Sequence, residues 1–74
     1  MGTETTEIPY TSSSGLAFTI RCIHSSGDQG GFFTVITSED PGVPYTRTRP
    51  RQWYNQRTAI EAAQRFIERE FGDN

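Results

Sequence analysis

The chain has 74 residues, a formal net charge of -2 and one cysteine. A chain of this length holds one domain and buries only about three fifths of the surface that its unfolded form exposes. The single cysteine, Cys22, excludes an intramolecular disulfide, and Cys22 with His24 falls short of the four ligands of a structural zinc site. We therefore predict no metal and no cofactor, and a homodimer or a bound partner becomes the remaining source of added stability.

The acidic balance of the chain, with a sequence pI of about 5.2, argues against bulk electrostatic attraction to nucleic acid or anionic lipid. No apolar stretch is long enough to cross a bilayer, so we expect no membrane association. The free cysteine fits a reducing compartment, and the first residues lack the basic start and apolar run of a secretory signal. These features predict an intracellular, cytoplasmic protein.

The first 14 residues are rich in Thr, Ser and Glu. This composition predicts a flexible tail over residues 1–14, followed by a single domain over residues 15–74. Ile8 and Tyr10 are apolar exceptions, and an additional strand over residues 7–10 remains an alternative.

Three strands are predicted in the domain. From Gly15 onward every second residue is apolar, which predicts a strand whose Leu16, Phe18, Ile20 and Cys22 share one face. Residues 25–31 are small, polar and glycine-rich and predict a hairpin loop. Residues 32–37 (FFTVIT) are apolar on both faces, which is typical of a central strand, although the pattern does not say which face meets the helix.

The third strand is predicted over residues 45–49 and limited by Pro50, because proline cannot donate to a strand ladder. Before it, Asp40-Pro41-Gly42-Val43 places Pro and Gly where a type II turn requires them. Consecutive hairpins give the strand order 1-2-3, with residues 32–37 in the middle.

The C-terminal helix has the clearest boundary signals. Thr58 followed by Glu61 matches a capping box, and Asn55 is an alternative cap one turn earlier. Gly72 is the expected terminator. Half of the helical wheel collects the apolar residues Ala59, Ile60, Ala62, Ala63, Phe66, Ile67 and Phe71. The chain is therefore predicted to be an α+β domain of β-β-β-α order, a three-stranded antiparallel sheet packed on one amphipathic helix.

Residues 45–54 have the most unusual composition. In an extended conformation Arg47, Arg49 and Arg51 lie on one side with Tyr45 and Trp53 flanking them. Arginine forks between aromatic faces grip phosphates, stack on bases or anchor protein interfaces. The competing interpretation is a solvated edge strand whose charge prevents aggregation, with Trp53 in the core.

The predicted pleat adds Arg21 to this group. If Leu16, Phe18, Ile20 and Cys22 face the helix, Arg21 is expected on the open face of the sheet together with the arginines of the third strand. The predicted binding residues are Arg21, Tyr45, Arg47, Arg49, Arg51 and Trp53.

Cys22 and His24 are the candidates for a catalytic role, because they lie two residues apart on one face of the first predicted strand. A thiolate and an imidazole also need an orienting group, an oxyanion hole and a pocket, and the sequence indicates none of them. Free cysteine is typical of cores, so we predict no catalytic residues and no enzymatic activity.

In outline, three strands followed by a helix with TAIEAAQRFI is similar to the sheet-plus-helix DNA-binding domains of the AP2 and integrase N-terminal type, which implies insertion of the sheet into the major groove. The chain lacks the basic and tryptophan pattern of their first two strands, and we assign it to no family. The leading hypothesis is a non-enzymatic protein-binding module, comparable in outline to small phage or mobile-element accessory and inhibitor proteins. A sheet-reading DNA-binding module that uses Arg47, Arg49 and Arg51 is the first alternative, and a structural homo-oligomer is the second.

Overall fold

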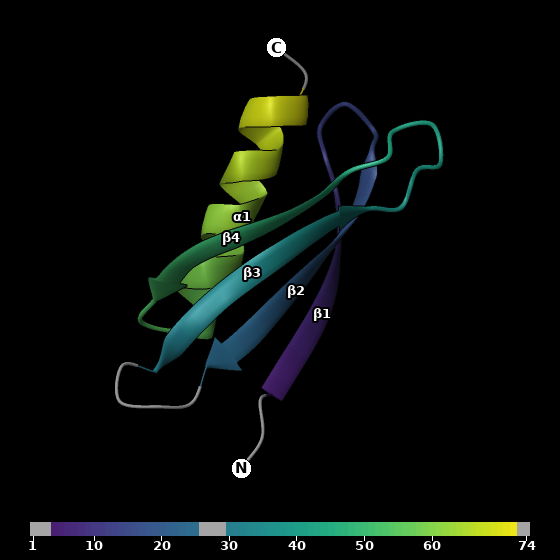
Figure 1. Ribbon diagram of the computed structural model, residues 1–74. Coiled ribbons are helices and arrows are strands. Elements are labelled where there is room, and N and C mark those ends of the chain that lie inside the picture. The colour runs from purple at the N-terminus through teal and green to yellow at the C-terminus, as the bar shows by residue number, and fades with distance from the viewer. Residues whose placement is uncertain (1–3, 26–29, 73–74) are drawn as a thin grey trace.

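The computed structural model describes residues 4–25 and 30–72. Four strands, β1 (Glu4–Thr11), β2 (Ala17–Ser25), β3 (Gly31–Ser38) and β4 (Thr46–Trp53), precede one helix, α1 (Gln56–Phe71). The strands pair antiparallel in the order β1-β2-β3-β4, and α1 covers one face of the sheet (Figure 1). The α+β class with a C-terminal helix is confirmed, but within the described residues the sheet has four strands instead of the predicted three. No helix among them is long and apolar enough to span a membrane.

The additional strand is β1, which lies at the opposite edge of the sheet from β4 (Figure 1). The prediction of a flexible tail is wrong for this segment, because residues 4–11 pair with β2 along their whole length. An edge strand needs little apolar content, since only one of its backbone sides and one of its faces is covered. Ile8 and Tyr10 supply that content, opposite Ile20 and Phe18 of β2.

A polar cluster fastens the β1–β2 turn to the helix. The Tyr10 hydroxyl donates to Glu68 at 2.5 Å, and the Ser13 backbone N–H and hydroxyl donate to the same carboxylate at 3.0 and 2.7 Å. The hydrogen bonds from Tyr10 and then Ser13 hold the pKa of Glu68 below its usual value. The hydrogen bond to Glu68 in turn raises the pKa of Tyr10.

The core lies between the sheet and the apolar face of α1. As predicted, Phe18, Ile20 and Cys22 of β2 are buried on the helix side. The register also shows which face of β3 meets the helix. Ile36 pairs with Ile20 and therefore faces the helix, whereas Val35 pairs with Arg21 on the open face. The central core residues are Phe18, Ile20, Ile36, Ala63, Phe66 and Ile67.

Asn55, and not Thr58, caps the helix. The Asn55 side chain accepts from the Thr58 backbone N–H at 2.8 Å, and α1 begins at Gln56. The capping box is therefore wrong and the alternative cap is right. Gly72 ends the helix as predicted, and the reason is close packing: its φ is -70°, but an added Cβ would lie 2.2 Å from the Glu68 carbonyl oxygen.

The turn between β3 and β4 also differs from the prediction. Val43 N–H donates to Asp40 C=O at 2.9 Å, as a β-turn requires. Gly42 does not have the positive φ that a type II turn needs, because Gly15 is the one described glycine with positive φ. Instead, the Asp40 carboxylate accepts from Gly42 N–H at 2.9 Å and stabilises the turn locally.

β4 continues through Pro50 to Trp53, beyond the predicted end at residue 49. Its register with β3 shifts between Phe32 and Thr34, so that Thr34 pairs with Arg49 and Phe32 with Trp53. Two extra residues of β4 are accommodated there. The proline is tolerated because β4 is an edge strand with one unpaired side.

Candidate functional site

The predicted arginine cluster is present on β4, and its members are held by aromatic rings. The Arg47 and Arg49 guanidinium carbons lie 5.3 and 4.1 Å from the centre of the Phe66 ring. Arg51 lies 4.2 Å from the centre of the Trp53 ring. We call Arg47, Arg49 and Arg51 the arginine strip.

The rings restrict the strip while leaving its charge accessible. Phe66 is 5% exposed and belongs to the core, so the surface under Arg47 and Arg49 is rigid. Stacking on a ring face attracts the cation and covers the aliphatic stem while the planar fork remains available for hydrogen bonds. Arg47 and Arg51 are exposed and Arg49 is half-buried. Among the described residues none of the three forms an ion pair with a carboxylate.

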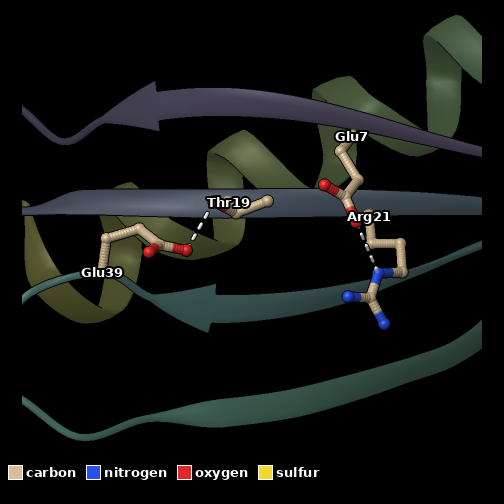
Figure 2. Close-up of polar contacts among 4 residues, drawn as sticks. All are labelled: Glu7, Thr19, Arg21 and Glu39. Atoms are coloured by element: carbon tan, nitrogen blue, oxygen red, sulfur yellow. Dashed lines mark hydrogen bonds and ion pairs between the residues drawn. The ribbon is translucent and has the colours of Figure 1, made fainter.

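Arg47 and Arg49 of the arginine strip lie on the helix side of the sheet, and this corrects the prediction that they share the open face with Arg21. Arg47 pairs with Ile36 and Arg49 with Thr34, both of which face α1. Arg21 points to the opposite face, and its Nε lies 3.3 Å from a Glu7 carboxylate oxygen. Figure 2 shows this pair on the sheet with the helix behind the strands. Arg21 is thus separated from the strip and already paired.

The open face contains few charges. Thr19 donates to Glu39 at 2.6 Å, beside the Arg21–Glu7 pair (Figure 2). Val35 and Thr48, which are neighbours on β3 and β4, lie on this face in the row of Arg21. A sheet-reading DNA-binding domain needs several cations on its open face, and here the register places Arg21 there but Arg47 and Arg49 on the helix side.

Of the two flanking aromatics, Tyr45 packs inward. Its ring contacts Phe18 at 6.5 Å and Phe71 at 5.0 Å between centroids. The Tyr45 hydroxyl is buried without a hydrogen-bond partner among the described residues. Tyr45 therefore belongs to the core margin, whereas Trp53 is half-buried beneath Arg51. Tyr54, which the sequence did not single out, is 95% exposed next to Trp53.

Two helix arginines extend the positive charge beyond β4. Phe66 faces the arginine strip, and Arg69, three residues later, shares that flank of the helix. Arg65 lies four residues before Arg69, and both are exposed. Glu68 is on the other flank, where it reaches Tyr10 of β1. The net charge therefore conceals a basic side, which the helical periodicity could have revealed once the position of Phe66 was known.

The Cys22 and His24 pair lacks the surroundings of a catalytic site. Cys22 is buried, and burial raises the pKa of its thiol, which disfavours the reactive thiolate. His24 stacks on Phe32 with a centroid distance of 4.4 Å. Among the described residues no group of His, Cys, Asp and Glu has the arrangement of a metal site.

A groove of about 510 Å³ runs along the first half of α1, lined by Gln56, Arg57, Ile60, Glu61 and Gln64. Arg57 and Glu61 form an ion pair at 3.2 Å within it. Because all five lining residues belong to one helix, they do not converge on a ligand from several sides. The arginine strip is the stronger candidate site.

No known family model matches the chain, and no curated protein or solved structure matches it significantly.

Proposed function

We propose that this chain is a small non-enzymatic binding protein that docks its arginine strip on an acidic surface of a partner protein. The observation that carries the proposal is the pairing of three guanidinium groups with two fixed rings and with no carboxylate among the described residues. Arginines that only keep an edge strand soluble need no such support. Arginine and tryptophan are also the residues that most often dominate binding energy at protein interfaces.

A protein partner is favoured over nucleic acid by the distribution of charge. The arginines occupy the margin of β4 and not the open sheet face, and the chain as a whole carries a net charge of -2. A polyanion is repelled by this net charge, whereas a partner with a local acidic patch meets only the strip. We expect duplex DNA to bind no tighter than the micromolar range at physiological salt.

The test compares two double variants with the same change in charge. Arg47→Gln with Arg49→Gln removes two cations of the strip, and Arg21→Gln with Arg57→Gln removes two that already pair with Glu7 and Glu61. Each protein captures partners from an extract of the native host, and a captured protein is then purified and titrated by calorimetry. Circular dichroism establishes that all variants are folded.

We expect the partner to bind the wild type and the control variant alike, and to bind the strip variant at least tenfold more weakly. An equal loss of affinity for the partner in the two double variants would refute the proposal. It would also fail if duplex DNA bound below one micromolar with a log-log salt slope near -3, the value for about three neutralised phosphates.

A further inference from the structure

The backbone of β4 offers unpaired hydrogen-bonding groups beside the arginine strip. Tyr45 C=O accepts from Ser38 N–H at 2.8 Å, so Tyr45 directs its polar groups toward β3. In an antiparallel ladder successive residues alternate in direction. Thr46 and Thr48 therefore direct their N–H and C=O groups away from the sheet. Both residues are exposed, and no described strand lies beyond β4.

The side chains of the strip stand where an added strand would meet them most closely. Arg47 and Arg49 alternate with Thr46 and Thr48, so a strand hydrogen-bonded to the two threonines would place its own residues opposite the arginines in non-hydrogen-bonded pairs. Facing side chains are closest in such pairs. Same-face residues recur about every 7 Å along a strand, which matches acidic residues at alternate positions.

The helix strengthens this preference for carboxylates. Arg69 lies three residues after Phe66, whose ring contacts Arg47 and Arg49, so this exposed cation adds positive charge on the flank of α1 next to β4. Of the two acids next to Arg69 in sequence, Glu68 lies on the other flank, where it accepts from Tyr10, and Glu70 forms no ion pair within the described residues. A neutral or basic segment would leave these cations without partners or bring like charges together.

We propose that β4 captures an extended segment of the partner by strand addition, with acidic residues at alternate positions opposite Arg47 and Arg49. This inference rests on the proposed function and names the structure that the partner must adopt. Main-chain hydrogen bonds to Thr46 and Thr48 give affinity, and the alternate side chains give specificity. Pro50 has no N–H, so the paired region ends after these two threonines.

A second copy of the chain fits this edge less well. Its own free edge is β1, where Ser12 N–H donates to Leu16 C=O and the same alternation directs Thr5, Glu7, Pro9 and Thr11 outward. Pro9 lacks an N–H in the middle of that run. If β1 of a second copy added antiparallel to β4, its outward residues would pair with Thr46 and Thr48, so Glu7 would lie on the open face. The residues opposite the arginines would then be Thr6, Ile8 and Tyr10, none of which is acidic.

The probes are two synthetic heptapeptides of the same composition, one with three Glu alternating with four Thr and one with the three Glu adjacent. A twelve-residue oligothymidine serves as the phosphate probe. Binding to the isotopically labelled full chain is followed by NMR, and the hydrogen exchange of the Thr46 and Thr48 amides is measured with and without each probe.

Three variants separate strand addition from charge alone. Thr48→Pro removes an outward N–H from β4 and leaves all arginines in place. Thr5→Pro makes the same change on β1 and is the matched control. Arg47→Gln with Arg49→Gln removes charge and leaves the backbone unchanged. A thermal melt verifies that each variant folds. If Thr48→Pro does not fold, the hydrogen-exchange measurement on the wild type still tests strand addition.

We expect the alternating peptide to bind at least tenfold more tightly than the block peptide and to slow exchange at Thr46 and Thr48. Thr48→Pro should weaken the binding of the alternating peptide roughly tenfold, as the loss of one main-chain hydrogen bond implies, and Thr5→Pro should not.

Equal binding of both peptides without amide protection, with affinity lost only in the arginine variant, would refute strand addition while the proposed function stands. Preferred binding of oligothymidine would refute both. Concentration-dependent self-association abolished by Thr5→Pro would assign β4 to a second copy and refute the inference.

Discussion

Truncating Phe66 to alanine tests the core and the candidate site together. Phe66 is 5% exposed and packs within the central cluster. Replacing a buried phenylalanine by alanine costs about 3 to 5 kcal/mol, through lost transfer energy and the cavity left behind. The contacts of the ring with Arg47 and Arg49 add about 0.5 to 1 kcal/mol each. We therefore expect Phe66→Ala to lower the free energy of unfolding by at least about 4 kcal/mol.

Such a loss is a large share of the stability of a small domain, which amounts to roughly 0.05 to 0.15 kcal/mol per residue. At about 4 to 8 °C per kcal/mol for this size, Tm should fall by at least about 15 °C. Urea unfolding monitored by the fluorescence of Trp53, the single tryptophan of the chain, measures the difference directly. Far-UV circular dichroism provides an independent probe of the same transition.

Tyr54→Ala is the matched control, because it removes an aromatic ring that is 95% exposed. It should change the free energy of unfolding by less than about 0.5 kcal/mol. Phe66→Leu keeps an apolar side chain but removes the ring, and its cost should fall between the two. A Phe66→Ala protein within 1 kcal/mol of the wild type would show that the helix face has been misassigned.

The remaining predictions concern single groups. The Cys22 thiol should react slowly in the native protein and quickly in denaturant, and rapid native labelling accompanied by loss of binding would revive a nucleophilic role. Asn55→Ala should destabilise the helix by about 1 kcal/mol, and an equal or larger loss in Thr58→Ala than in Asn55→Ala would contradict the observed cap. Tyr45→Phe removes a buried hydroxyl without a described partner and should leave stability unchanged or raise it; a loss above 1 kcal/mol would reveal a hydrogen bond at that hydroxyl. The folded-state pKa of Glu68 is lowered, so its contribution is fully present above the unfolded-state value of about 4.3 and is lost as pH falls through the folded-state value. Urea titrations from pH 7 to pH 3 should therefore show the advantage of wild type over Glu68→Gln shrinking only below about pH 4.5, and a constant difference would refute the assignment.

Elements with a strong local pattern could be predicted from the sequence. The alternation of Phe18, Ile20 and Cys22 fixes the buried face of β2, and the apolar arc of α1 fixes the side that meets the sheet. Both patterns are repeated along one element and depend on no other part of the chain. β1 has no such pattern, because an edge strand is held mainly by backbone pairing with β2.

The face of the arginine strip depends on register, which is a property of two strands and the turn between them. The pairing of Ile36 with Arg47 puts the strip on the helix side, and a shift by one residue would move it to the open face. The sequence does contain a relevant signal. Tyr45 and Trp53 have the same parity as the three arginines, and both are at least half-buried. Aromatic residues at both ends of the alternating run indicate that this side of β4 faces the core margin.

With this placement, the arginines of β4 can both protect the edge from aggregation and bind a partner, so the two interpretations of the charged strand are compatible. Arginines on an edge discourage pairing with neutral segments and with the same edge of a second copy, since like charges would oppose each other directly. The same charges attract an acidic segment, and Phe66 and Trp53 hold them in position before it arrives. Specificity is a difference between two affinities, so protection against the wrong strand and recognition of the right one follow from the same three side chains. Arg47→Lys with Arg49→Lys separates these effects: lysine keeps the charge that protects the edge but lacks the planar fork and the ring stacking. The lysine variant should remain monomeric in analytical ultracentrifugation and should bind the acidic partner more weakly than the wild type.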